Sequence, residues 1–338
     1  MSPDKIFVIA EAGINHDGQL EKALEMVSEA KKAGADAIKF QTFKADEFCS
    51  DDREYTYISQ GETITEPMID MFKRYEFCEE DWVLIKKEAS RVGIEFFSTP
   101  QNLSDLQLLL KVGIGRIKVG SDDLTNLNLI KAYASYGLPI ILSTGMSTIS
   151  EIDDAISAAG WHSGAEVTVM VCTSEYPSPL ESINVSRVTT LKNAFPGLRV
   201  GFSDHTESNI SSIMASALGA EVFEKHFTLD KGSSGPDHRF SLNPAELKSW
   251  VSDLRNSLIA KGTGVFYPTT QEQKMKELAR RSVVANTDIY PNEILTTDNL
   301  ALKRPGTGIP PKFIDSIIGK KTKYHIKKDS QISWEFLT

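Results

Sequence analysis

The chain has 338 residues, of which 41% are hydrophobic and 25% are charged, and its formal net charge is −9. This length suits one large domain followed by a small one, and the negative charge argues against general binding to nucleic acid or to an anionic membrane surface. The three scattered cysteines fit neither a disulfide framework nor a zinc motif. No apolar stretch approaches the roughly 18–20 residues of a membrane span, and no secretory signal is recognisable. We therefore expect a soluble cytoplasmic protein.

The N-terminal part of the chain alternates short apolar segments with amphipathic ones. Residues 5–12 form an apolar, β-branched run, residues 20–33 carry apolar side chains at helical spacing, and residues 37–41 form a second short run. Short apolar strands separated by amphipathic helices are typical of a parallel sheet that is covered on both faces.

Residues 43–78 interrupt this alternation with a polar segment that is rich in aromatic residues. One helix is predicted within it, at residues 67–75, and the regular pattern resumes with a helix at residues 79–92. A connection of this length is either a functional lid or a poorly ordered segment. Its position after the second strand favours the lid.

The alternation then continues until eight strands are predicted. The remaining six lie at residues 94–98, 116–119, 139–142, 167–171, 198–202 and 220–223. Apolar spacing also predicts a helix at residues 209–218 and a last one at residues 244–260. Eight strands with intervening helices are the pattern of a (β/α)₈ barrel. An open, doubly wound sheet is the alternative, but no G-x-G-x-x-G motif follows the first strand.

The pattern of apolar and turn-forming residues changes after the last of these helices. From about residue 281, short apolar runs alternate with turn signals, which indicates a small domain rich in strands. We predict a barrel domain at residues 1–262, a linker at residues 263–280 and the small domain at residues 281–338.

Polar side chains stand near the carboxyl ends of all eight predicted strands. The carboxyl ends of barrel strands meet at one face, and active sites of such barrels form there. The residues at these positions are Glu11, Lys39, Gln41, Thr99, Lys118, Ser121, Ser143, Thr144, Thr173, Ser174, Ser203, Asp204, His205, Glu224, Lys225 and His226.

Two lysines of this set, Lys39 and Lys118, alternate with apolar neighbours inside their strands. Each points either into the barrel mouth or into the helix layer. We expect the mouth, because the helix layer would have to bury an unpaired charge. Lysines beside serine and threonine hydroxyls are typical of a receptor for a phosphate or a carboxylate.

His205 and His226 follow two strands that are neighbours in the predicted barrel. They could hold a divalent metal that polarises a carbonyl or activates water. Two unrelated hydrogen-bonding histidines are the alternative on spacing alone. With the carboxylate of Glu11 in the same mouth, the residues suggest carbon–carbon bond formation or hydrolysis on a phosphorylated substrate.

Several motifs resemble those of the sialic acid synthase family, in the order of that family and over nearly the whole chain. They include IAEAGINHDG at residues 9–18, KVGS at 118–121, GFSDHT at 201–206, GPDHRFSLNP at 235–244 and KRPGTGI at 303–309. The resemblance implies a (β/α)₈ TIM barrel followed by a small C-terminal antifreeze-like (SAF) domain. It also implies domain-swapped homodimers, in which that small domain caps the active site of the partner.

The family condenses phosphoenolpyruvate with an N-acylated amino-hexose to give a nonulosonic acid and phosphate. N-acetylmannosamine, giving N-acetylneuraminate, is the acceptor that the resemblance favours. The alternative is a legionaminic acid synthase, or less closely a pseudaminic acid synthase, which uses a diacetamido-trideoxy-hexose.

Three other interpretations fit less well. A metal-dependent hydrolase on the same barrel usually needs an H-x-H pair on the first strand, and that strand has none. The C-terminal domain argues against an aldolase that joins phosphoenolpyruvate to a phosphorylated aldose. An ice-binding module on an inactive barrel would not need the complete set of site residues.

The resemblance implies roles for individual residues. Glu11 would be the acid/base group near the aldehyde, with Lys39 and Gln41 in the same mouth. His205 and His226 would bind a divalent metal, typically Mn²⁺, with Mg²⁺ or Co²⁺ as alternatives. The residues implied to bind the two substrates are Thr99, Lys118, Ser121, Ser143, Ser174, Tyr176, Ser203, Asp237 and, from the small domain, Arg304.

Overall fold

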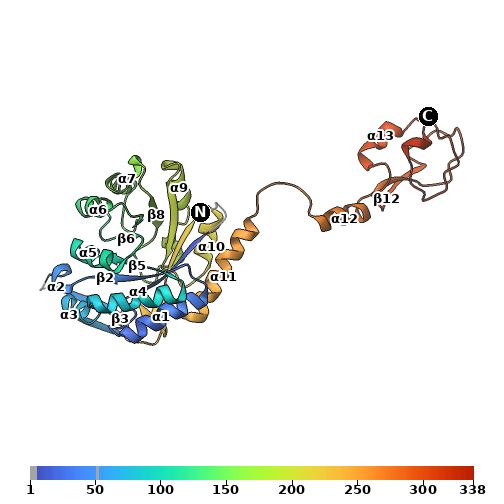
Figure 1. Cartoon of the computed structure of the whole chain (residues 1–338). Helices are drawn as coiled ribbons and strands as arrows, with labels where there is room; N and C mark the ends of the chain where they lie inside the picture. Colours follow the sequence, from blue (N-terminus) through green and yellow to red (C-terminus); the bar gives the residue numbers. More distant parts are fainter. Residues whose placement is uncertain (1–5, 51–52) are drawn as a thin grey trace. The chain divides into compact units, whose positions relative to one another are not determined.

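The structure, a computed structural model, describes residues 6–50 and 53–338, and Figure 1 shows the course of the chain. The start of the strand predicted at residues 5–12 and of the domain predicted at residues 1–262 lies outside the described residues. The chain divides into two compact units, of which the first ends at Gly262 and the second runs from Thr263 to Thr338. Each unit has a hydrophobic core of its own.

Eight parallel strands form the centre of the first unit. Their order is β5-β2-β1-β10-β9-β8-β7-β6. The two ends of this order, β5 and β6, pack against each other, so the sheet curls into the predicted barrel. The strands are β1 (Phe7–Gly13), β2 (Ala37–Thr42), β5 (Glu95–Pro100), β6 (Ile117–Val119), β7 (Ile140–Ser143), β8 (Val167–Val171), β9 (Arg199–Asp204) and β10 (Val222–His226).

Helices follow the strands and cover the barrel (Figure 1). Helix α1, for example, buries an alanine-rich face that includes Met26 and Val27, and it ends where Gly34 adopts the left-handed conformation with φ of 91°. The α-helices of this unit are α1 (Leu20–Ala33), α2 (Ala45–Phe48), α3 (Met68–Lys73), α4 (Glu79–Val92), α5 (Leu103–Val112), α6 (Leu127–Ala134), α7 (Ile149–Ala158), α8 (Leu180–Ile183), α9 (Arg187–Ala194), α10 (Ile210–Ala217) and α11 (Pro244–Lys261). None of the helices in the described part of the chain is long and apolar enough to cross a membrane.

Helix α10 forms where apolar spacing predicted a helix, but its apolar face is not the buried one. Ile210 is 55% exposed and Met214 is 51% exposed. The buried face carries small residues, namely Ser211, Ser212, Ala215 and Ser216. The hydroxyl of Ser212 accepts a hydrogen bond from Trp250 Nε1 at 3.0 Å and donates one to Asp204. Small, hydrogen-bonded side chains therefore let this helix pack closely on the barrel.

The segment after β2 folds into more structure than the sequence predicted. It contains an antiparallel hairpin, β3 (Glu54–Ser59) and β4 (Glu62–Pro67), in addition to the expected helix, which is α3. The hairpin turns at Gln60 and Gly61, which both have positive φ, at 51° and 85°. Two residues with positive φ define the turn that matches the twist of a tight hairpin.

The second unit contains one longer helix and a small two-stranded sheet. Helix α12 (Thr270–Ala279) lies within the segment predicted as a linker, and Thr269 and Glu272 form a capping box at its start. The sheet consists of β11 (Ser282–Ala285) and β12 (Leu300–Lys303), and a short helix, α13, spans Ile314–Ile317. The buried residues of this unit include Val283, Ile289, Leu295, Ile309 and Ile332.

Candidate active site

A cavity of about 710 Å³ lies where the carboxyl ends of the barrel strands meet. All the predicted site residues of the barrel line it, namely Glu11, Lys39, Gln41, Thr99, Lys118, Ser121, Ser143, Ser174, Tyr176, Ser203, His205, His226 and Asp237. Arg304 belongs to the second unit, where it is exposed just after β12. The individual roles of these residues stay predictions.

Lys39 occupies the floor of the cavity between two carboxylates. Its Nζ lies 2.8 Å from Glu11 Oε2 and 3.6 Å from Glu224 Oε2, and it donates a hydrogen bond to Thr99 Oγ1 at 3.2 Å. Both Lys39 and Glu11 are almost fully buried, at 3% and 2% exposure. The lysine therefore points into the mouth, as its alternation with apolar residues predicted.

Lys118 is the second buried cation of the cavity. Its Nζ donates to Ser143 Oγ at 2.6 Å and lies 3.8 Å from Glu224 Oε1. Ser203 Oγ donates to the same carboxylate oxygen at 2.9 Å. Burial lowers the pKa of Lys118, and Glu224 opposes this effect. An ammonium group held this way, beside a serine hydroxyl and facing the cavity, is suited to bind a phosphate or a carboxylate.

The carboxyl groups of Glu11 and Glu224, which both contact Lys39, have different pKa values. Burial raises the pKa of Glu11 to about 7, although Lys39 opposes the rise. Burial acts in the same direction on Glu224, but the ammonium groups of Lys118 and Lys39 outweigh it and hold the pKa of Glu224 below its ordinary value. Carboxyl groups whose environments separate their pKa values can act as a proton donor and as a fixed anion. Glu11 is the candidate donor.

The proton on Glu11 leads to a first testable prediction. We expect kcat/KM to fall as the pH rises above about 7, because the protonated form of Glu11 is then lost. Glu11→Gln keeps the shape of the side chain but cannot titrate, so its pH–rate profile should be lower and lack this decline. A Glu11→Gln profile with an unchanged decline near neutral pH would exclude Glu11 as its source.

His205 and His226 lie side by side in the cavity wall, with ring centroids 5.4 Å apart. His205 Nδ1 donates to the carbonyl oxygen of Thr173 at 2.6 Å, so the lone pair lies on Nε2, which has the Ser203 hydroxyl oxygen at 3.4 Å. His226 Nδ1 is buried without a hydrogen-bond partner among the described residues, and the nearest carboxylate oxygen, on Asp237, is 3.7 Å away. Burial lowers the pKa of both imidazoles.

Neutral imidazoles are the form in which histidine binds a divalent metal. The pair therefore fits a metal. Within residues 6–50 and 53–338, no group of three or more His, Cys, Asp or Glu side chains is arranged to hold a metal. The protein would thus contribute two imidazoles, and other ligands would have to come from water or substrate.

The upper wall of the cavity brings Tyr176 and Asp237 close to these groups. The Tyr176 ring lies 4.3 Å from the His205 ring. Desolvation raises the pKa of Asp237 to about 6. Gly13 has φ of 50°, and a Cβ there would lie 3.3 Å from Glu11 Oε1 and 3.9 Å from Asp237 Oδ2. The carboxyl groups of Glu11 and Asp237 thus both lie near Gly13, whose missing side chain leaves space for a substrate.

Strand alternation separates the polar residues at the ends of β9 and β10. Glu224 and His226 of β10 line the cavity, whereas Lys225 between them does not. Lys225 Nζ lies 3.1 Å from Asp204 Oδ2 and donates to the carbonyl oxygen of Thr206 at 2.6 Å, on the other face. Glu224 carries no role in the sequence predictions, although it stands two residues before His226 and so shares its face.

The segment between β2 and α4 supplies a part of the cavity wall, mostly aromatic and apolar, whose residues the sequence did not reveal. From the hairpin and its flanking helices come Phe48, Tyr55, Thr56, Tyr57, Ile58, Met71 and Phe72. Phe48 and Phe72 pack edge to face with ring centroids 5.1 Å apart. Cys172 and Arg239 also line the cavity without having been predicted. Apart from Cys172, which directly follows β8, these side chains come from helices, loops or the unexpected hairpin, so strand-end position could not identify them.

The barrel and its mouth together define a class of protein: a (β/α)₈ enzyme whose cavity combines buried lysines and serine hydroxyls, a carboxyl group with a raised pKa and a pair of buried imidazoles. Comparison with known proteins makes this more specific. Residues 26–266 match the NeuB family and residues 280–338 match the SAF domain, so the chain belongs to the NeuB family. The predicted family and the predicted C-terminal domain type are thereby confirmed.

Curated relatives and solved structures agree with this assignment. The chain is 37% identical over 338 residues to the N,N′-diacetyllegionaminic acid synthase of Legionella pneumophila, covering 98% of this chain and 94% of that one. It is 38% identical over 332 residues to the enzyme of the same name from Campylobacter jejuni, covering 97% and 99%. The crystal structure of N-acetylneuraminic acid synthetase from Leptospira borgpetersenii superimposes with a TM-score of 0.72 at 33% identity, covering 81% of this chain and 90% of that one.

Proposed function

We propose that the protein is a nonulosonic acid synthase, which joins phosphoenolpyruvate to an N-acylated amino-hexose and releases phosphate. The observation that carries the proposal is the arrangement of one cavity, in which Lys118 lies among serine hydroxyls and Glu11 is a buried acid. The names of the relatives support the same reaction.

In this proposal the two substrates occupy different parts of the mouth. Lys118 and the hydroxyls of Ser121, Ser143 and Ser203 bind the phosphate and carboxylate of phosphoenolpyruvate, and Asp237 and Tyr176 contact the sugar. Preorganised cations and hydroxyls of this kind stabilise the charge that develops as the phosphate leaves.

The bond changes follow from these positions. C3 of phosphoenolpyruvate attacks the aldehyde carbon of the open-chain sugar, and Glu11 delivers its proton to the aldehyde oxygen. Water adds to the cationic C2 and returns one proton to Glu11. The bond from C2 to the phosphate oxygen then breaks, so that phosphate leaves with the remaining hydroxyl proton and a ketone forms at C2. His205 and His226 would hold a divalent metal, Mn²⁺ or alternatively Mg²⁺ or Co²⁺, which when bound supplies Lewis-acid polarisation of a carbonyl.

Two acceptors fit this scheme, N-acetylmannosamine and a diacetamido-trideoxy-hexose. They differ at C4, where the second sugar bears an acetamido group, and at C6, where it has a methyl group in place of a hydroxymethyl group. The apolar side chains of Phe48, Met71 and Phe72 favour the second, because they can bury its methyl groups. The hydroxyls of Tyr55, Thr56 and Tyr57 on the same segment can bind polar groups of either sugar. The names of the Legionella and Campylobacter relatives favour it as well.

The test is phosphate release from phosphoenolpyruvate in the presence of a panel of aldoses. The panel contains N-acetylmannosamine, its 6-phosphate, and the diacetamido-trideoxy sugars of the mannose and altrose series. We expect the diacetamido-trideoxy mannose to give the highest kcat/KM. A higher kcat/KM for N-acetylmannosamine would contradict the inference that the apolar side chains of the cavity favour the diacetamido-trideoxy sugar. If none of these sugars changed the rate of phosphate release, the proposed synthase activity would be refuted.

We further propose that the enzyme works as a domain-swapped homodimer, in which the partner subunit's Arg304 contacts the N-acyl group of the sugar. The support is the family resemblance and the match of residues 280–338 to the SAF domain.

Removing the chain after about Lys276 should leave a folded barrel without turnover. The barrel should fold because its hydrophobic core lies within the first unit. Circular dichroism and phosphate release would measure the two properties, and full-length Arg304→Ala serves as the comparison that removes only the cation. An active truncated chain would contradict the capping role.

A further inference from the structure

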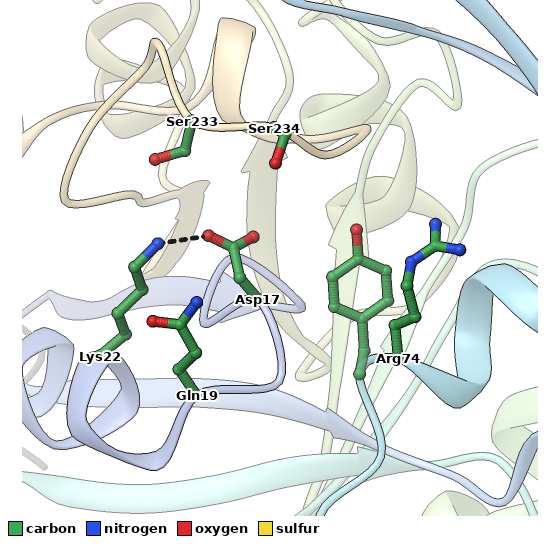
Figure 2. Close-up of a pocket in the computed structure, with 7 residues that line it drawn as sticks. Asp17, Gln19, Lys22, Arg74, Ser233 and Ser234 are labelled. Carbon is green, nitrogen blue, oxygen red and sulfur yellow. Dashed lines mark hydrogen bonds and ion pairs between the residues drawn. The ribbon is translucent and has the colours of Figure 1, made fainter.

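A second cavity, of about 400 Å³, lies near the barrel mouth and shares no lining residue with the catalytic one. Figure 2 shows three segments that are distant in sequence converging on it: the loop from β1 into α1, the chain just after α3, and the loop after β10. Its lining residues are Asp17, Gln19, Lys22, Arg74, Tyr75, Ser233 and Ser234.

Contacts between these segments hold the cavity in shape. A Cβ on Gly18 would lie 2.0 Å from the carbonyl oxygen of Arg74, so the loop before α1 touches the chain after α3. From the hairpin, Gln60 Nε2 donates to the carbonyl oxygen of Gly232 at 2.9 Å, and Ser59 Oγ accepts from the backbone N–H of Gly235 at 3.0 Å. The walls are therefore connected to one another, as expected of a preformed binding site.

The charges of this cavity are paired within the protein. Lys22 Nζ lies 2.7 Å from Asp17 Oδ2 (Figure 2), and Arg74 donates two hydrogen bonds, at 2.6 and 2.7 Å, to the carboxylate of Glu66. Each cation thus has its own carboxylate. These pairs largely cancel the positive charge of the cavity, so the cavity favours an uncharged ligand.

Other hydrogen-bonding groups of the cavity are unused. The side chains of Gln19, Ser233 and Ser234 make no hydrogen bond within the described residues, and all three border the cavity in Figure 2. Tyr75 adds a phenol, and burial raises the pKa of this group to about 12, so it keeps its hydrogen. Hydroxyl and amide groups around a small preformed space suit a polyhydroxylated ligand.

We propose that this second cavity binds a neutral monosaccharide, separately from the catalytic cavity. Its position also connects it to the catalytic wall. His238 hydrogen-bonds through Nε2 to Asp17 Oδ1 at 2.8 Å and through Nδ1 to Thr228 Oγ1 at 2.7 Å, and its neighbour Asp237 lines the catalytic cavity. A sugar bound to Ser233 and Ser234 stabilises the loop that carries Asp237.

The test uses the full-length protein and N-acetylmannosamine as the probe, with the number of bound equivalents measured by calorimetry. Ser234 is exposed, so Ser234→Trp should fill the cavity without disturbing the fold and should lose one equivalent relative to the unaltered chain. Ser90, an exposed serine on α4, provides the matched control, and Ser90→Trp should lose none. Equal stoichiometry in the unaltered chain and Ser234→Trp, or an equal loss in both variants, would overturn the proposal.

Two further measurements test the chemistry of the ligand. Tyr75→Phe keeps the ring and removes one hydrogen bond, so it should weaken this binding event roughly 3- to 10-fold. Mannose 6-phosphate should not occupy the site, because no cation there lacks a carboxylate. Unchanged affinity in Tyr75→Phe, or loss of mannose 6-phosphate binding in Ser234→Trp alone, would overturn the assignment to a neutral sugar. These binding measurements do not depend on turnover, so they test the second cavity separately from the proposed synthase activity.

Discussion

Lys118→Ala should raise the KM for phosphoenolpyruvate roughly 10- to 150-fold, because hydrogen bonds to charged groups contribute about 1.5–3 kcal/mol. The substitution removes a buried ammonium group that donates to Ser143 Oγ at 2.6 Å and faces the cavity. The KM for the sugar should change much less, since the sugar is expected to bind beside Asp237. Steady-state kinetics with each substrate varied in turn measure both constants.

Lys225→Ala is the matched control for this experiment. Lys225 is also a buried lysine on a barrel strand, but it pairs with Asp204 outside the cavity. Its removal leaves a buried carboxylate without its cation, so it should lower the melting temperature while the KM for phosphoenolpyruvate stays nearly constant. An unchanged KM for phosphoenolpyruvate in Lys118→Ala would refute the proposed anion receptor.

Chelation of divalent metal should abolish turnover, and added Mn²⁺ or Mg²⁺ should restore it. The expected loss is at least roughly 100-fold, because Lewis-acid stabilisation of a transition state contributes several kcal/mol. The prediction rests on two buried imidazoles 5.4 Å apart between ring centroids, with the lone pair of His205 on Nε2 and His226 Nδ1 without a partner among the described residues. Phosphate release before and after dialysis against EDTA measures it.

Variants of single histidines separate metal loss from general damage. His226→Ala should stay inactive after metal is added back, whereas His162→Ala should behave like the unaltered chain, because His162 lies in the exposed turn after α7. Full activity in excess chelator would exclude the metal role of His205 and His226.

The architecture could be predicted because its signals are local. Runs of β-branched residues and helical spacing of apolar residues follow from burial on two faces of a strand or one face of a helix. The same logic placed Lys39 and Lys118 in the mouth, since a buried cation needs a carboxylate or a hydroxyl nearby. In the structure Lys39 has Glu11 at 2.8 Å, and Lys118 has Ser143 at 2.6 Å.

The features that escaped prediction depend on packing between distant segments. The sequence does not show that α10 buries its serines, because the hydrogen-bond partners of Ser212, which are Asp204 and Trp250, come from other elements. The importance of Glu224 likewise emerges only when Lys39 and Lys118 approach it from two other strands. The hairpin was missed for a different reason: its turn is Gln-Gly, which is a weaker signal than Asn-Gly or Asp-Gly.

The two separate hydrophobic cores determine how unfolding experiments on this protein should be interpreted. Three of the four tryptophans, Trp82, Trp161 and Trp250, lie in the barrel unit, and the fourth, Trp334, is 48% exposed in the second unit. Intrinsic fluorescence will therefore report mainly on melting of the barrel. A chain with two cores need not unfold in one cooperative step, so a single fluorescence midpoint would leave a damaged C-terminal unit undetected. A reporter placed in residues 281–338, or calorimetry of the whole chain, would reveal such damage.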